Sequence, residues 1–186
     1  VNIAQIALVS DDALDQVLEE GLLDLAVTDF LAGFGKTVQL ELRDEALHYA
    51  RNVLRLEAGA RLTVFDGLGH EFSATVVADG KRSLTLQPEA ALDTLADTGL
   101  EIHLGIGLSR GERMDWVIQK STELGVRSIT PLLLARCNAR FEEKRADNRM
   151  RHWKQVAISA CEQCGRARLP LIEHPADPVQ HAAGAQ

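Results

Sequence analysis

Hydrophobic and polar residues alternate over short runs between residues 37 and 87, which is the pattern of half-buried β-strands. Four such runs predict strands at residues 37–42, 61–65, 71–78 and 83–87. Glycine-containing turns at residues 66–69 and 79–80 separate the last three runs, as in β-hairpins. Strands at this spacing predict a small antiparallel β-barrel.

Two segments in the first half of the chain have helical periodicity. Residues 10–20 begin with a capping serine and predict a short acidic helix, with Leu14, Val17 and Leu18 on one face. A second helix is predicted from Asp44, which can cap it, to residue 54. Its inward face is expected to consist of Ala46, Leu47, Ala50 and Leu54.

The second half of the chain has a different pattern, which begins after a predicted linker at residues 88–99. Strands are predicted at residues 100–108, 128–134 and 169–172, and helices at residues 111–124 and 148–164. This alternation indicates an α/β domain with a parallel sheet covered by helices. The buried helix faces are predicted to contain Met114, Val117, Ile118 and Leu124, and Trp153, Val156, Ala157 and Ala160. Three strands alone would leave an open apolar edge, so the domain is expected to be incomplete at residue 186.

Composition narrows the class of protein. No apolar run approaches the ~20 residues of a membrane span, and no secretory signal is visible at residues 1–35. Three cysteines argue against a disulfide framework and for a reducing cytoplasm. The net charge is −7, yet residues 136–168 hold nine basic and four acidic residues. This local excess is consistent with a polyanionic partner, and equally with a solvated helix face.

The glycine-rich segment at residues 105–111 follows a predicted strand and opens a helix. Its GxGxxxG spacing departs from the dinucleotide-binding fingerprint, and no acidic residue follows at the distance that ribose recognition needs. We therefore expect these glycines to permit close packing and a sharp turn. Arg110 and Arg113, at the start of the helix, could receive a phosphate.

The predicted helix at residues 111–124 carries Arg113, Trp116, Lys120 and Glu123 on one face. Cations beside an indole can hold an RNA backbone and stack a base. In the alternative interpretation, Trp116 is a packing residue and Lys120 pairs with Glu123. Spacing alone does not decide between them.

Three other groups of residues are candidate sites. Cys161 and Cys164 form a CxxC pair, with Cys137, His152 and His174 as further possible metal ligands, although ordinary packing is the commoner role of such cysteines. A polar stripe on the helix at residues 148–164 is either a site or the solvent face, and consists of Gln155, Ser159, Glu162 and Arg166. The helix at residues 44–54 carries His48, Arg51 and Arg55. These residues form either a phosphate clamp or part of an ordinary solvent-exposed surface.

Several longer strings match one family in order and spacing. Residues 46–55 (ALHYARNVLR), followed by Gly59 and residues 65–67, resemble its N-terminal barrel. Residues 107–126 (GLSRGERMDWVIQKSTELGV) are similar to its most recognisable stretch. Residues 129–131 with Arg136, and residues 160–166 (ACEQCGR), also match. Over residues 37–173 the chain resembles RsmE-type 16S ribosomal RNA uridine-N3 methyltransferases.

The resemblance implies both a fold and a function. It implies a PUA-like RNA-binding barrel at residues 36–90 and the N-terminal part of a knotted SPOUT methyltransferase domain at residues 99–186, after an acidic extension at residues 1–35. It further implies a cytoplasmic homodimer that methylates 16S rRNA with S-adenosylmethionine, without metal or membrane. The family's cofactor pocket is formed by glycine-rich and Arg-Thr-Glu segments that do not occur in this chain, so no cofactor-binding residue is expected in it.

Residue roles follow as expectations from helix faces and local charge. Glu123 and Glu162 are the candidate proton acceptors. The candidate RNA contacts are Arg51, Arg55, Arg110, Arg113, Lys120, Arg136, Arg140 and Arg166. One alternative is a non-catalytic RNA-binding module, because the cofactor-binding knot is missing from the chain. A third interpretation is a metal- or thiol-dependent α/β protein built on Cys137, Cys161 and Cys164.

Overall fold

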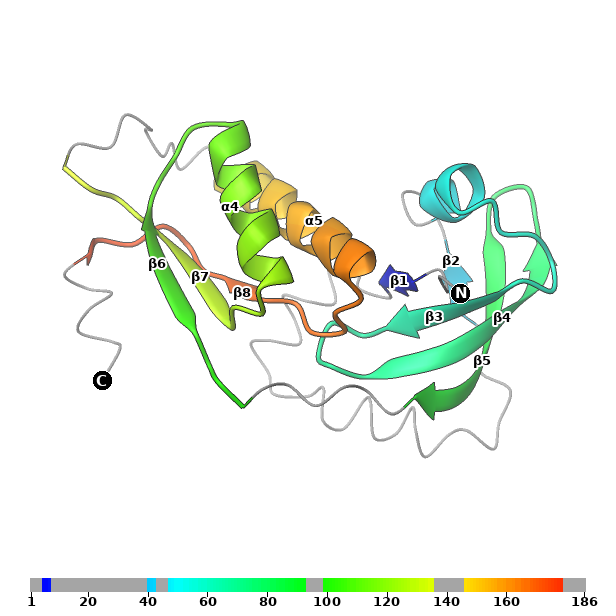
Figure 1. Cartoon of the computed structure of the whole chain (residues 1–186). Coiled ribbons are helices and arrows are strands. Elements are labelled where there is room, and N and C mark those ends of the chain that lie inside the picture. Colours follow the sequence, from blue (N-terminus) through cyan, green and yellow to red (C-terminus); the bar gives the residue numbers. More distant parts are fainter. Residues whose placement is uncertain (1–4, 8–39, 43–46, 93–98, 136–145, 179–186) are drawn as a thin grey trace. The chain divides into compact units, whose positions relative to one another are not determined.

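The computed structural model describes residues 5–7, 40–42, 47–92, 99–135 and 146–178 (Figure 1). The chain divides into two compact units, Val1–Leu95 and Ala96–Gln186. None of the helices in the described ranges is long and apolar enough to span a membrane. The predicted helix at residues 10–20 lies outside the described residues.

The first unit contains a five-stranded sheet in the order β1-β3-β4-β5-β2. Its strands are β1 (Gln5–Ala7), β2 (Leu40–Leu42), β3 (Arg61–Phe65), β4 (Glu71–Asp79) and β5 (Leu84–Leu92). β3, β4, β5 and β2 pair antiparallel, which confirms the strands predicted from alternation. β1 pairs parallel with β3 and adds an edge strand that the pattern did not predict.

The linker predicted from residue 88 onward is wrong for its first part, because β5 continues to Leu92. Pro88 had suggested the end of the strand. It lies opposite Ala74, next to a register shift between Ser73 and Ala74 in the pairing of β4 with β5. A bulge of this kind is one of the few places in a sheet that accept proline, which has no N–H to donate.

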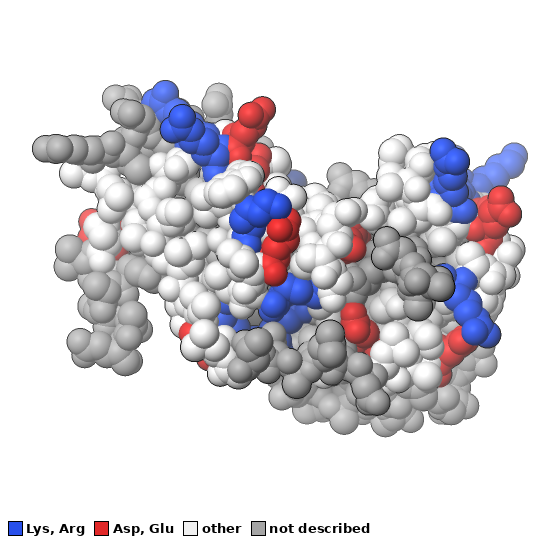
Figure 2. All heavy atoms as spheres, in the orientation of Figure 1, with Lys and Arg blue, Asp and Glu red and all other residues white. Residues whose placement is uncertain are grey.

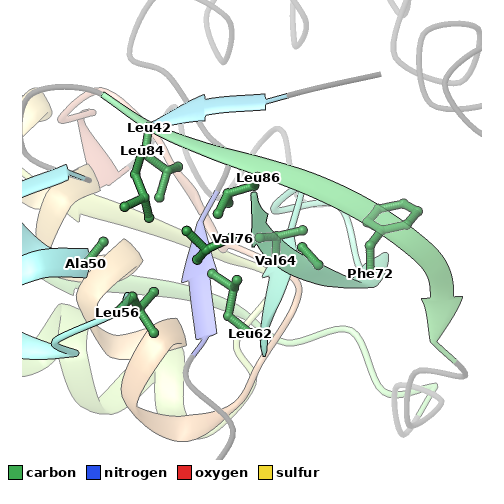
Figure 3. Packing of buried hydrophobic residues seen from close by; sticks show 10 residues of the cluster. Leu42, Ala50, Leu56, Leu62, Val64, Phe72, Val76, Leu84 and Leu86 are labelled. Atoms are coloured by element: carbon green, nitrogen blue, oxygen red, sulfur yellow. The ribbon is translucent and has the colours of Figure 1, made fainter. Parts of the chain in front are cut away.

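Alternation along the central strands builds the core of the first unit (Figure 3). Leu62 and Val64 of β3 are buried, and full burial of a side chain of this size contributes about 1.5–3 kcal/mol. The remaining buried side chains of this cluster are Leu42, Ala50, Leu56, Phe72, Ala74, Val76, Leu84 and Leu86.

A short helix, η1 (Tyr49–Val53), covers this core. Its wide turn is seen in the hydrogen bond from the Leu54 N–H to the Tyr49 carbonyl, at 3.1 Å. Ala50 is completely buried, and Leu47 and Leu54 pack against the cluster, as predicted for the helix at residues 44–54. Ala46 lies outside the described residues.

The second unit has the predicted strand–helix alternation. Strands β6 (His103–Gly107), β7 (Ser128–Leu132) and β8 (Leu171–Ile172) form a parallel sheet in that order. Helices α4 (Glu112–Glu123) and α5 (Ala146–Cys164) make the two crossovers and pack against each other. Successive right-handed crossovers between adjacent strands place both helices on the same face of the sheet.

The buried face of α4 differs from the prediction at two positions. Met114 and Ile118 are buried as expected, whereas Val117 is only half-buried and Leu124 is 80% exposed. The prediction failed because Leu124 is the cap residue after the helix, and the inward face continues at Ser121 and Thr122 instead. Thr122 satisfies its hydroxyl by donating to the Ile118 carbonyl at 2.8 Å.

Strand β7 is buried on both faces, as the middle strand of a parallel sheet should be. Ile129 packs with the helices, together with Trp153 and Ala157 of α5, which the helical pattern had placed inward. On the other face, the Thr130 hydroxyl donates to Glu173 Oε2 at 2.6 Å. The buried hydroxyl is therefore satisfied.

Candidate functional site

The segment between β6 and α4 lies at the carboxyl edge of the parallel sheet, where α/β proteins commonly bind ligands. Gly107 permits close packing there, because a Cβ atom at this position would lie 2.8 Å from Leu134 Cδ1. Gly111 caps α4 with a φ of +52°, which confirms the sharp turn expected of these glycines. Arg110 and Arg113 are both exposed at this edge.

The outer face of α4 combines cations with an aromatic ring. Trp116 is 62% exposed, which excludes the interpretation as a core packing residue. Lys120 Nζ donates to both carboxylate oxygens of Glu123 at 2.8 Å, so the predicted pairing is present as well. Arg113, one turn before Trp116 along the helix, is exposed as well.

Both helices of the second unit end at the opposite, amino edge of the sheet. There, Arg166 packs over Gly125, which directly follows the cap residue of α4. A pocket of about 180 Å³ opens at this edge. Its lining residues are Gly99, Leu100, Glu101, Gly125, Val126, Arg127, Arg166 and Arg168. Basic side chains thus lie near both ends of α4 (Figure 2).

Two arginines of this pocket were not among the predicted site residues. Arg168 belongs to the basic loop after α5, and its charge was visible in the sequence. Arg127 had no such signal, because it reaches the pocket only through the start of β7. Its main chain is held on both sides, since its N–H donates to Ile102 at 2.8 Å and its carbonyl accepts from Leu171 at 3.0 Å.

The predicted site residues of the second unit are divided between the two edges. Arg110 and Arg113 lie at the carboxyl edge, whereas Glu123, Glu162 and Arg166 lie near the helix ends at the amino edge. Ten residues of α-helix separate Arg113 from Glu123, which corresponds to about 15 Å along α4. Arg136 and Arg140 lie outside the described residues.

The two arginines of the first unit that were predicted to contact RNA, Arg51 and Arg55, differ from each other in their contacts. Arg51 donates to the Lys81 carbonyl at 3.1 Å and also binds the Asp79 carboxylate and the Gly80 carbonyl. It therefore holds the turn between β4 and β5. Arg55 is exposed and closes η1 with a φ of +52°.

The CxxC cysteines have unequal environments. Cys161 is fully buried and its Sγ donates to the Arg168 carbonyl at 3.5 Å. Burial, and secondarily the neighbouring Cys164, raise the pKa of the Cys161 thiol to about 12. Cys161 therefore stays protonated, while Cys164 is exposed. Within the described part of the chain, no three His, Cys, Asp or Glu residues gather in a way that could hold a metal ion. Cys137 lies outside that part.

Comparison with known families matches both units. Residues 42–89 match the family described as RNA methyltransferase PUA domain, and residues 96–183 match the RNA methyltransferase domain family. Over 136 residues the chain is 38% identical to ribosomal RNA small subunit methyltransferase E of Buchnera aphidicola subsp. Acyrthosiphon pisum. That match covers 72% of this chain and 53% of the relative, so the chain spans about half the length of the curated relatives it matches.

Solved structures share the fold. The protein Lpg2936 from Legionella pneumophila, solved in complex with the bound cofactor SAM, has a TM-score of 0.81 and 31% identity, and the match covers 100% of this chain and 68% of that one. Ribosomal RNA small subunit methyltransferase E from Neisseria gonorrhoeae, solved bound to S-adenosyl methionine, has a TM-score of 0.73 and 32% identity over 81% of this chain and 61% of that one. The predicted fold class, a PUA-like sheet followed by a SPOUT-type parallel-sheet domain, is thereby confirmed. The chain belongs to the ribosomal RNA small subunit methyltransferase E family.

Proposed function

We propose that the protein containing this chain transfers a methyl group from S-adenosylmethionine to N3 of a uridine in small-subunit ribosomal RNA. The observation that carries the proposal is the succession along the chain of a PUA-like sheet and a parallel-sheet unit, which match an RNA methyltransferase PUA domain and an RNA methyltransferase domain, in a chain whose relatives are named ribosomal RNA small subunit methyltransferase E. A non-catalytic RNA-binding module is the less favoured alternative, because those relatives are named as enzymes.

S-adenosylmethionine supplies a methyl group activated by a positively charged sulfur. The amino-edge pocket does not fit this cofactor. At about 180 Å³ it is smaller than the ~300 Å³ of typical small-molecule sites, and its three arginines would repel a cation. We therefore assign no cofactor contact to the described residues and derive no step through the cofactor.

The roles of this chain's own residues are binding and orientation of RNA. Arg110 and Arg113 are proposed to hold phosphates at the carboxyl edge, and Trp116 to stack on a base turned out of its helix. Uridine N3 must lose a proton during the reaction, and Glu123 and Glu162 remain the candidates to accept it. Since Lys120 binds both oxygens of Glu123, that carboxylate also fixes a cation on α4.

The proposal is tested with the polypeptide expressed from the complete gene. It is incubated with unmodified small ribosomal subunits and labelled S-adenosylmethionine, and the RNA is digested for mass spectrometry of its nucleosides. N3-methyluridine is the expected product. Two results would contradict the proposed function. One is label on another nucleoside, and the other is no label at all when the protein does bind the subunits. Subunits methylated beforehand are the matched control and should accept no label.

The family resemblance also predicts a homodimer that acts in the cytoplasm. These two points extend the proposal, and each has its own test. Light scattering of the purified polypeptide measures its mass in solution, and fractionation of the source cells locates it. A monomer that methylates at full rate would remove the dimer from the proposal and leave the reaction itself intact.

A further inference from the structure

The pocket at the amino edge of the parallel sheet is separate from the carboxyl edge, where Arg110 and Arg113 lie. We propose that Arg127, Arg166 and Arg168 form a second RNA contact, which binds a backbone phosphate of the ribosomal RNA substrate. This inference rests on the proposed function, because it takes RNA as the ligand. It adds a binding site at the other end of α4.

The charge of the pocket suits a phosphate. Three arginines line it against one acidic residue, Glu101. Arg127 Nε and Glu101 Oε1 are 3.7 Å apart, and their side chains are 41% and 67% exposed. An exposed pair at this distance is held weakly, so Arg127 can exchange the carboxylate for a phosphate. The planar fork of arginine can donate two parallel hydrogen bonds to phosphate oxygens.

The backbone around the pocket is arranged before any ligand binds. Arg127 is anchored through its main chain to Ile102 and Leu171, and the Arg168 carbonyl accepts from the Cys161 thiol. Gly125 leaves room for the Arg166 guanidinium, since a Cβ atom there would lie 3.1 Å from Arg166 Cζ. Little conformational freedom in the main chain is therefore lost when a ligand binds.

A purely structural role, without a ligand, explains only part of the arginine cluster in this pocket. The carbonyl groups at a helix C-terminus attract cations, and α4 and α5 both end at this edge. That attraction explains a guanidinium over Gly125. It does not explain Arg127, which comes from the start of β7 and adds a third positive charge to the same pocket.

The position of the pocket fits an extended ligand. α4 contains 12 residues and is therefore about 18 Å long, and the two groups of arginines lie near its two ends. An RNA strand of several nucleotides spans such a distance. RNA held at both ends of α4 would pass along the helix whose outer face carries Trp116.

The test measures binding of the 186-residue chain to a fluorescent single-stranded RNA from the small subunit, at several salt concentrations. Arg127→Gln and Arg168→Gln should each weaken binding about three- to tenfold. Each should also reduce the slope of log K against log salt by about 0.7, the contribution of one phosphate contact in single strands. Arg151→Gln is the matched control, because it removes the same charge from an exposed position near the other end of α5. It should leave the slope unchanged.

A second pair of variants keeps every charge. Gly59 and Gly125 have nearly the same positive φ, of +86° and +87°, but only Gly125 lines the pocket, and only its Cβ atom would meet Arg166. Gly125→Ala should therefore displace the Arg166 guanidinium and weaken RNA binding, whereas Gly59→Ala, outside the pocket, should have little effect. Thermal unfolding of each variant verifies that it is folded.

The outcomes separate the two proposals. Unchanged affinity and salt slope in folded Arg127→Gln and Arg168→Gln would overturn the pocket while leaving the proposed function intact. A chain that binds no RNA at all would count against the RNA substrate and therefore against both. If these variants change the sedimentation coefficient of the chain and leave RNA affinity unaltered, the pocket is a protein contact and our assignment is wrong.

Discussion

The guanidinium of Arg166 packs directly over the α-carbon of Gly125, so that a Cβ atom at position 125 would overlap Nη1 and lie 3.1 Å from Cζ. This contact joins the loop after α5 to the end of α4. Glycine meets two requirements here, a φ of +87° and the absence of a side chain below the arginine. Each requirement can be measured separately.

Gly125→Ala is expected to destabilise the second unit by about 1–2 kcal/mol, which is the strain of a left-handed alanine. The contact with Arg166 should add little, because the atoms that meet the new Cβ are the end of a flexible side chain that can move aside. Gly99→Ala, with a φ of +72° and no neighbour within 4 Å of its Cβ, should therefore cost about the same. Urea unfolding of the two variants measures these free energies. A clearly larger cost for Gly125→Ala that disappears in an Arg166→Ala background would show that Arg166 cannot move aside.

Asp66 organises the turn between β3 and β4. Its Oδ1 accepts from the Leu68 N–H at 2.7 Å and the His70 N–H at 3.1 Å, and its Oδ2 lies 2.6 Å from His70 Nδ1. Asp66→Ala should lower the free energy of unfolding of the first unit by about 1–2 kcal/mol, because two backbone donors lose their partner. Asp66→Asn keeps an acceptor for them and should cost less than half as much. His70→Ala, which leaves the backbone bonds intact, serves as the control in the same denaturation series, and a loss equal to that of Asp66→Ala would assign the effect to the imidazole.

Cys161 should make the stability of the second unit depend on pH in the alkaline range. Its pKa is about 12 in the folded chain, against an ordinary value of 9.0. Below pH 9 the thiol is protonated in both states, and its contribution is fully present. Between about pH 9 and 12 only the unfolded chain releases the proton, so stability falls by up to about 1.4 kcal/mol per pH unit.

Chemical unfolding at pH 8 and at pH 10.5 tests this dependence. Cys161→Ala should lose less stability between the two pH values than the wild-type chain, although it is less stable at both because of the cavity it creates. Cys164→Ala should retain most of the wild-type loss, since burial is the main cause of the raised pKa of Cys161 and Cys164 only the second. Peptide mapping after alkylation at pH 8 should find Cys164 modified well before Cys161. The reverse order would contradict the buried environment.

Trp116 offers a spectroscopic test of the outer face of α4. The chain has two tryptophans, and Trp153 is only 3% exposed whereas Trp116 is 62% exposed. Acrylamide should therefore quench the emission of Trp116 and spare that of Trp153, and Trp116→Phe should remove most of the quenching. If α4 binds RNA as proposed, saturating RNA should protect Trp116 in the wild-type chain. Quenching that RNA does not alter would exclude this face from the interface.

Local patterns in the sequence were enough for much of the fold. The strand at Arg61–Phe65 was predicted to the residue, and the one at Glu71–Asp79 to within one residue, because side chains alternate across a strand whatever lies further away. The extent of α4 and its buried Met114 and Ile118 followed from helical periodicity in the same way. The family, too, could be identified from the string at residues 107–126.

Errors arose where a distant segment decides the local structure. Pro88 marked a false strand end, because only the pairing of β5 with β4 provides the bulge that accommodates it. The binding of Arg51 to the turn at Asp79, 28 residues along the chain, also could not be predicted from local sequence. The burial predicted for Leu124 was wrong because α4 ends one residue earlier, at Glu123.

By itself, the sequence determined the order of the strands and helices from β2 to β8, the class of each unit and the family, but not the edge strand β1. Only the tertiary structure decided which charges share a pocket. Arg127, Arg166 and Gly99 come from three separate segments, and no periodicity links them. The physical reason is that parallel strands bring their amino ends together at one edge, so residues far apart in the chain come to lie side by side there.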